Sequence, residues 1–241
     1  MIAHRASASS RRSALGTLTA AGLSSAVSPA QAEAEVSGRP GHVVLLGDSV
    51  FDNAAYVAGG PDVVNHLRRS LPAGWQATLA ALDGAVTADV RRQLSRVPAG
   101  ATHLVVSAGG NDALRAEAVL AHPVHNVAEG LERLAQARER FVGEYHAMLD
   151  AVFARGLPIV LCTIYDPRFQ DRLRQRLAVA GLALFNDVII RAALSRRLSM
   201  LDLRLVCSED ADFANPIEPS IQGGQKIAAA IADMVLKQTS G

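Results

Sequence analysis

The sequence predicts an α/β fold in which a parallel sheet lies between two layers of helices. Short apolar runs of strand length recur along the chain, and longer segments with helical periodicity separate them. The 241 residues, of which 49% are hydrophobic and 20% charged, suit one core-forming domain. Strands joined through helices pair in parallel by right-handed crossovers. We therefore expect a three-layer α/β/α sandwich.

Five strands and five helical segments are expected, with the last long crossover helix broken at Gly181. The strand runs are 43–46, 77–82, 104–107, 159–163 and 201–206. The helical segments are 62–71, 87–97, 127–154, 168–198 and 222–238. A parallel five-stranded sheet of this kind is typical of the flavodoxin-like architecture, where ligands bind beyond the carboxyl ends of the strands. Residues that directly follow a strand are therefore the candidates for function.

The first 38 residues differ from the rest of the chain. Small residues dominate, and the pair Arg11-Arg12 precedes a weakly apolar run at 14–27 and an A-x-A sequence at 30–32. This pattern resembles a twin-arginine export signal, although a disordered extension would have a similar composition. We expect a leader or extension at 1–38 before a domain at 39–241, in a protein that is either exported or cytoplasmic. The apolar run is too short for stable insertion in a membrane.

The net charge and the cysteine content limit the classes of partner that the chain is expected to bind. The formal net charge of +1 disfavours a nucleic-acid partner, which requires concentrated Lys and Arg. Cys162 and Cys207 lack metal-ligand spacing and are expected to be buried free thiols. No glycine-rich phosphate loop follows the first strand, so no cofactor is expected. These observations favour a small-molecule ligand.

Three strand ends carry residue types suited to acyl transfer. A serine that begins a helix after a tight glycine turn can act as a nucleophile, and the helix N-terminus favours negative charge nearby. A turn glycine and an asparagine amide can each offer an N–H group to an oxyanion. Taken singly, such residues are usually turn formers or helix caps. In chain order the three strand ends read Gly47-Asp48-Ser49, Asp83-Gly84-Ala85 and Gly109-Gly110-Asn111-Asp112.

These three segments resemble the first three blocks of the SGNH/GDSL hydrolases, which are serine esterases and acylhydrolases of flavodoxin-like fold. The resemblance extends over about residues 42–237. It implies that Ser49 is the nucleophile and also lends its backbone N–H to the oxyanion. It further implies that Gly84 and Asn111 complete the oxyanion hole, and that the substrate is an ester or acyl compound.

The last block departs from this family, whose pattern is D-x-x-H-P. Here the sequence reads Asn215-Pro216-Ile217-Glu218-Pro219. The landmarks Gly223 and Ile227-Ala228 downstream align Glu218 with the family's histidine and Asn215 with its aspartate. All seven histidines lie between His4 and His146, so none lies in this loop.

Three explanations of the departure remain open. Glu218 could serve as general base if neighbouring acids (Asp48, Asp52 and Asp112) raise its pKa. The same acidic group could instead hold Mg²⁺ or Ca²⁺, although no metal motif is present. Alternatively, the chain has lost its chemistry and binds a small acyl or glycan ligand in the same cleft. A histidine from elsewhere, such as His122 or His125, is a further candidate base.

The remaining site predictions concern the surroundings of this dyad. A carboxylate base has no tautomer for an aspartate to fix, so Asn215 is free to hydrogen-bond Glu218. Tyr165 follows the fourth strand and is expected to line the substrate pocket. Asp48, Asp52 and Asp112 are expected to contact substrate from the same edge of the sheet.

Overall fold

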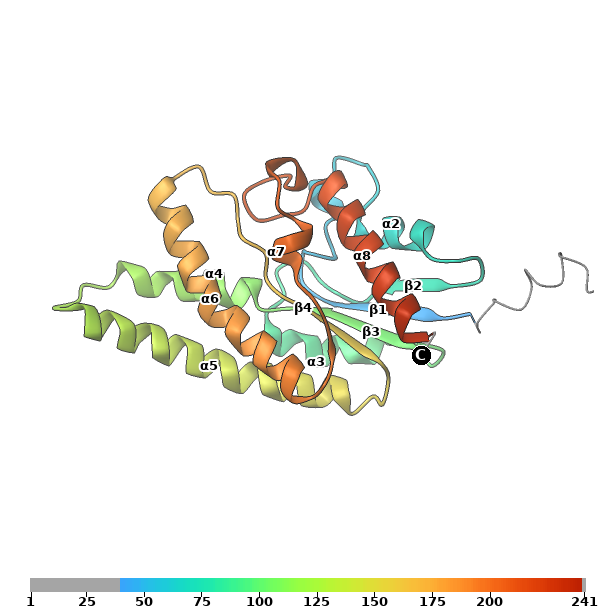
Figure 1. Ribbon diagram of the computed structural model, residues 1–241, viewed down its shortest axis with the longest axis horizontal. Coiled ribbons are helices and arrows are strands. Elements are labelled where there is room, and N and C mark those ends of the chain that lie inside the picture. Colours follow the sequence, from blue (N-terminus) through green and yellow to red (C-terminus); the bar gives the residue numbers. More distant parts are fainter. Residues whose placement is uncertain (1–39, 240–241) are drawn as a thin grey trace, which may run out of the picture. The chain divides into compact units, whose positions relative to one another are not determined.

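The computed structural model describes residues 40–239, and the predicted export signal lies outside this range. Five parallel strands form one sheet in the order β2-β1-β3-β4-β5 (Figure 1). The strands are β1 (His42–Gly47), β2 (Gln76–Leu79), β3 (His103–Ser107), β4 (Ile159–Cys162) and β5 (Ser199–Leu201). The sheet confirms the predicted flavodoxin-like fold.

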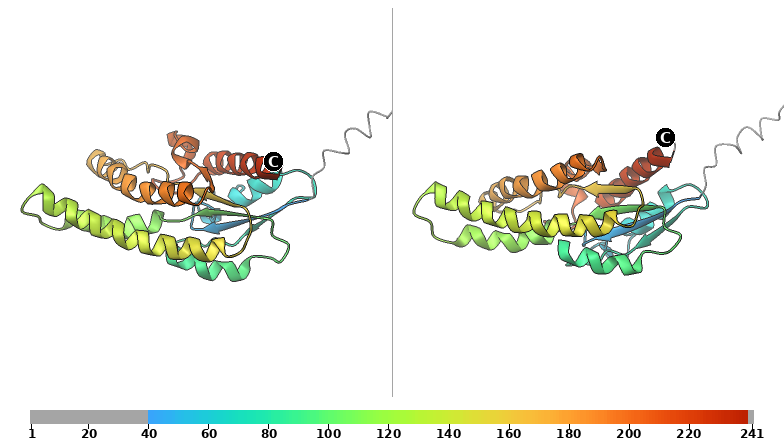
Figure 2. Two further views of the ribbon diagram at one scale, coloured as in Figure 1. Left: turned by 60° about the horizontal axis from the view of Figure 1, so that its bottom comes forward. Right: turned by 90° about the horizontal axis from the view of Figure 1, so that it is seen from below.

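Helices cover both faces of the sheet, as the strand sequences require. Val43 and Leu45 of β1 are buried against one layer, while Val44 and Leu46 are buried against the other. The first layer comprises α2 (Val63–Ser70), α7 (Leu203–Val206) and α8 (Ile221–Thr239). The second comprises α3 (Val90–Gln93), α5 (Val127–Phe153) and α6 (Arg172–Ser195). The two long helices α5 and α6 continue past the end of the sheet (Figure 2).

Short helical segments occupy the loops. They are the helix α4 (Gly110–Ala116) and the 3-10 segments η1 (Ala54–Tyr56), η2 (Thr87–Asp89), η3 (Leu94–Arg96), η4 (Glu117–Ala121) and η5 (Asp210–Asp212). The predicted helix over 87–97 is therefore three short pieces. Neither α4 nor η4, which follow β3, was predicted from the sequence.

Two further predictions about secondary structure were wrong. The run 201–206 is not a strand, since β5 ends at Leu201 and a helical turn follows. The Asp202 carboxylate accepts the Arg204 N–H at 3.1 Å, and this cap starts the turn. Helix α6 is not broken at Gly181. A mid-helix glycine costs only about 1 kcal/mol relative to alanine, which the packing of α6 in the core offsets.

Gly47 allows the sharp exit from β1 that presents Ser49. It has a φ of +135°, and a Cβ there would lie 1.7 Å from the Ser107 carbonyl oxygen of β3. Only glycine fits this close approach. The strand order reverses between β1 and β3, so the residues after these two strands meet at the switch point where ligands bind. Cys162 and Cys207 are buried free thiols, as predicted.

Candidate active site

Ser49 and Glu218 meet at the carboxyl end of β1. The Ser49 hydroxyl donates to Glu218 Oε1 at 3.0 Å, although 169 positions separate the two residues. Both residues are buried, with 7% and 5% of their surface exposed. The pair thus satisfies the distance that a serine and its general base require.

Burial raises the pKa of the Glu218 carboxyl to about 7. The hydrogen bond from Ser49 acts in the opposite direction, and the charge of Asp83 adds a smaller upward shift. Glu218 Oε2 is buried and has no hydrogen-bond partner among the described residues. Since no donor stabilises that oxygen, the anion is a stronger proton acceptor than an exposed glutamate.

Asn215 holds the main chain of Glu218 rather than its carboxylate. Its side-chain oxygen accepts the backbone N–H groups of Ile217 and Glu218, each at 3.0 Å. The predicted hydrogen bond between Asn215 and Glu218 thus exists at the backbone. It fixes the turn from which the carboxylate projects.

Two more side chains hold the Glu218 loop from the sheet side. The Tyr165 hydroxyl donates to the Ile217 carbonyl at 2.6 Å. The fully buried Asn53 donates its amide to the Pro219 carbonyl at 3.1 Å. The loop is therefore anchored on both sides of Glu218, and Tyr165 also lines the pocket. Asn53 was not predicted from the sequence to have this role.

Hydrogen-bond donors suited to an oxyanion lie beside Ser49. No partner for the Ser49 backbone N–H is present among residues 40–239. The Asn111 amide lines the same pocket and donates to the Ala85 carbonyl at 2.9 Å. That bond orients the amide and leaves its second N–H for a ligand. Gly84 does not line this pocket but a separate surface depression beside Ala85.

The four acids expected to gather at the site divide into two groups. Asp48 lines the pocket with Glu218, and burial raises its pKa to about 7, with the charges of Glu218 and Asp112 contributing less. Asp112 instead accepts both the backbone and the hydroxyl of Thr87 at 2.9 Å.

Asp52 likewise turns away, since its carboxylate accepts the Asp83 N–H at 2.9 Å. Neither Asp52 nor Asp112 lines the pocket. Within residues 40–239, no three His, Cys, Asp or Glu side chains are placed to share a metal ion.

The candidate histidines lie away from Ser49. His122 and His125 are exposed between η4 and α5, and His103 stacks on Trp75 at the opposite end of β3. No histidine of the described part of the chain lines the pocket. Glu218 is the side chain that accepts the hydrogen bond from the Ser49 hydroxyl.

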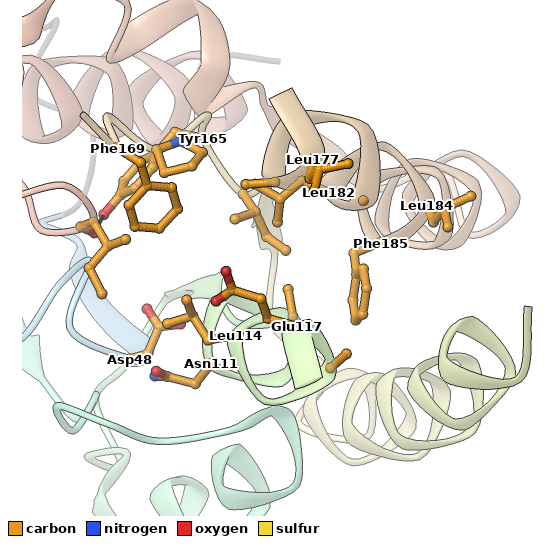
Figure 3. Close-up of a pocket in the computed structure, with 18 of the residues that line it drawn as sticks. Asp48, Asn111, Leu114, Glu117, Tyr165, Phe169, Leu177, Leu182, Leu184 and Phe185 are labelled. Atoms are coloured by element: carbon orange, nitrogen blue, oxygen red, sulfur yellow. Dashed lines mark hydrogen bonds between the residues drawn. The ribbon is translucent and has the colours of Figure 1, made fainter. Parts of the chain in front are cut away.

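An apolar pocket extends from the dyad, and its apolar walls were not predicted from the sequence. Figure 3 shows Asp48 and Asn111 at one end and Leu177, Leu182 and Phe185 of α6 along the far wall. The pocket holds about 950 Å³ including its open mouth. Its walls come from α4, η4, α5, α6 and the segment 164–169 that follows β4, so they combine several separate parts of the chain.

Comparison with known proteins points to one family. A sequence profile described as the GDSL-like lipase/acylhydrolase family matches residues 45–223. A search of curated proteins finds no match.

Solved structures share the fold at low identity. An extracellular lipase from Streptomyces rimosus is 17% identical, with a TM-score of 0.59 over 82% of this chain and 99% of its own. A phospholipase A1 from Streptomyces albidoflavus is 17% identical, with a TM-score of 0.55 over 82% and 99%. A psychrotrophic esterase from Pseudoalteromonas is 16% identical, with a TM-score of 0.55 over 83% and 99%.

Proposed function

The chain belongs to the GDSL-like lipase/acylhydrolase family, and on that premise we propose that it hydrolyses esters with Ser49 as nucleophile and Glu218 as general base. The observation that carries the proposal is the 3.0 Å hydrogen bond from the Ser49 hydroxyl to the Glu218 carboxylate. The raised pKa of Glu218, about 7, suits a base that works near neutral pH.

In the acylation half-reaction, Ser49 Oγ attacks the ester carbonyl carbon while Glu218 Oε1 takes the hydroxyl proton. The carbonyl oxygen becomes an oxyanion, which the Ser49 backbone N–H and the Asn111 amide receive. The intermediate collapses by breaking the bond to the alcohol oxygen. Glu218 returns its proton to that oxygen. The alcohol then departs, and the acyl group remains bonded to Ser49 Oγ.

Deacylation repeats the sequence with water. Glu218 takes a proton from the water as its oxygen attacks the acyl carbon, and the oxyanion is again held by the same two donors. Cleavage of the bond to Ser49 Oγ releases the carboxylic acid, and the proton on Glu218 returns to Oγ. Because a carboxylate carries protons on either oxygen without a tautomer to select, the step requires no third residue to orient the base.

Covalent labelling with a fluorophosphonate tests this function. We expect the wild-type chain to be labelled at Ser49, Ser49→Ala not to be labelled, and Glu218→Gln to be labelled far more slowly. The matched control is Glu144→Gln, an exposed acid on α5, which should label as the wild type does. If Glu218→Gln labels at the wild-type rate, Glu218 is not the base. No labelling of the wild type would instead favour a catalytically inactive protein that binds an acyl or glycan ligand.

We also propose that residues 1–38 export the domain that begins at residue 39. The twin-arginine-like sequence supports this proposal, and the extracellular lipase among the structural relatives agrees with it. Expression of the full chain in a bacterium with a twin-arginine pathway should yield a mature form that starts after Ala32. Replacing Arg11 and Arg12 by lysine should retain the protein in the cytoplasm. Retention of the unmodified chain would refute export.

A further inference from the structure

The pocket beyond the dyad is polar at one end and apolar along the rest of its length. The polar end is formed by Ser49, Glu218, Asp48 and Asn111. The walls beyond them are mainly aliphatic and aromatic, and they include Leu114, Leu120, Leu134, Ile164, Phe169 and Phe185. A ligand that fills this space must therefore be apolar except at the end that reaches Ser49.

One charged side chain interrupts the apolar walls, and it is neutralised. The Glu117 carboxylate accepts two hydrogen bonds from the Arg174 guanidinium of α6, at 2.7 and 2.9 Å. This pair lowers the pKa of Glu117, so its charge stays matched to that of the arginine. Arg174 also stacks on Phe169, 3.9 Å from the ring centroid. The pair thus ties η4 to α6 along the wall and leaves no free charge to bind a polar ligand.

The α6 wall sets the length of the pocket. Its lining residues run from Leu177 to Phe185, which at 1.5 Å per residue covers about 12 Å. Carbon–carbon bonds of about 1.5 Å allow a zigzag alkyl chain of about eight to ten carbons over that distance. Leu120 and Leu177 line the pocket and are still 43% and 41% exposed, so the apolar space reaches the surface.

Resting on the function proposed above, we infer that the preferred substrates are esters of medium-chain acids, with the acyl chain in this pocket and the ester carbonyl at Ser49. An acetyl group would leave nearly all of the apolar wall uncovered. A sugar would bury its hydroxyl groups against side chains that offer no partners, at a cost for each group. The acyl chain of an ester is the occupant that matches both ends of the pocket.

Gly181 determines how far the chain can extend. This residue lines the pocket in the middle of α6, and a Cβ built on it meets no atom within 4 Å. The space that the missing side chain leaves is therefore available to the ligand. Gly181→Phe would fill that space, and the helix tolerates the change because phenylalanine has a better helix propensity than glycine.

The test compares acetate and decanoate p-nitrophenyl esters. Because each buried methylene is worth a factor of about four in binding, we expect the wild type to favour decanoate by at least about tenfold in kcat/KM. Gly181→Phe should lower the decanoate-to-acetate ratio by at least about tenfold. The control is Gly143→Phe on α5, an exposed helical glycine whose Cβ also meets nothing within 4 Å. Its ratio should match the wild type.

A binding measurement separates the two proposals. Dansyl decylamide, a neutral fluorescent alkyl probe, should bind the wild type and Gly143→Phe, should be displaced by decanol, and should bind Gly181→Phe weakly. If no ester is hydrolysed but this binding pattern holds, the hydrolase proposal fails and the alkyl pocket stands. If acetate is hydrolysed without any preference for decanoate, the alkyl pocket is refuted and the hydrolase proposal stands. If the probe does not bind the wild type, the alkyl pocket is refuted, and ester hydrolysis alone decides the hydrolase proposal.

Discussion

Replacement of Glu218 by glutamine should abolish most of the esterase activity while leaving the pocket intact. The amide is isosteric with the carboxylate, so its oxygen can still accept the Ser49 hydroxyl at the position now 3.0 Å away. It cannot take the proton. Since general-base catalysis contributes about 10²–10⁴ in rate, kcat/KM for a short ester should fall by about that factor.

The pH profile gives the same prediction a second measurement. Only ionised Glu218 can act as a base, and burial raises its pKa from 4.5 to about 7. With that pKa, the ionised fraction and therefore kcat/KM should rise about tenfold between pH 6 and pH 8. An ordinary glutamate would give a flat profile over that range. The assay is the initial rate of p-nitrophenyl acetate hydrolysis against pH for the wild type and Glu218→Gln.

A second variant at position 218 tests the distance between the carboxylate and Ser49 Oγ. Glu218→Asp keeps the charge but shortens the side chain by one bond, about 1.5 Å, which moves the carboxylate beyond hydrogen-bond reach of Ser49 Oγ. It should therefore lose nearly as much activity as Glu218→Gln. The reasoning is refuted if either variant keeps the wild-type kcat/KM. It is also refuted if the rise with pH survives in Glu218→Gln but disappears in Asp48→Asn, since the titrating base would then be Asp48.

Further predictions concern the surroundings of the dyad. Asn111→Ala removes the proposed oxyanion donor and should lower kcat by about 10²–10³; a kcat within a factor of two of the wild type would exclude that role. Asp48 has a pKa raised from 3.8 to about 7 by burial, so the stability it contributes is present below about pH 4 and is lost as the pH rises through about 7. Urea unfolding should therefore find Asp48→Asn more stable than the wild type by about 2–4 kcal/mol at pH 8 and equal to it at pH 4, and equal stability at both pH values would contradict the raised pKa. Tyr165→Phe removes the hydrogen bond to the Ile217 carbonyl and should lower the free energy of unfolding by about 1 kcal/mol, with kcat reduced more than KM is changed; an unaltered kcat would show that this bond does not position the base. Gly47→Ala should prevent recovery of folded protein, because the new methyl group would overlap the Ser107 carbonyl, and normal folding by circular dichroism would rule out that overlap.

The central strands β1, β3 and β4 could be predicted from sequence because each contains an uninterrupted apolar run. Such runs are buried on both faces in a parallel sheet and carry their own signal. The end of β5 was predicted wrongly because the residues after it are also apolar, so apolar content did not distinguish the strand from the helical turn that follows. Leu203 and Leu205 continue the apolar run, whereas the cap that Asp202 provides to Arg204 is a local hydrogen bond that overrides it.

The candidate site, like the sheet, contains some residues that could be predicted from the sequence and others that could not. Ser49, Asn111 and Glu218 were identifiable because each directly follows a strand or occupies a fixed position in a motif. The apolar walls of the pocket were not, since leucine and alanine on α5 and α6 are equally expected in a core. Asp52 and Asp112 were expected at the cleft on strand-end position alone. Their carboxylates instead accept backbone N–H groups of neighbouring turns, which is a frequent use of aspartate in loops.

Asn215 and Glu218 stand where the family pattern has aspartate and histidine, and a single change of base from histidine to glutamate accounts for both differences. A histidine base needs a partner that selects its tautomer and stabilises its charged form, whereas a glutamate base is neutral once protonated and needs neither. Asn215 is then free to cap the turn that carries Glu218, and its side-chain oxygen accepts two backbone N–H groups there. An aspartate could accept the same two bonds, but its charge would lie close to Glu218 and oppose ionisation of the base. Asn215→Asp should therefore preserve the fold and move the midpoint of the pH profile upward, and a midpoint that does not move would show that the neutral amide is not needed.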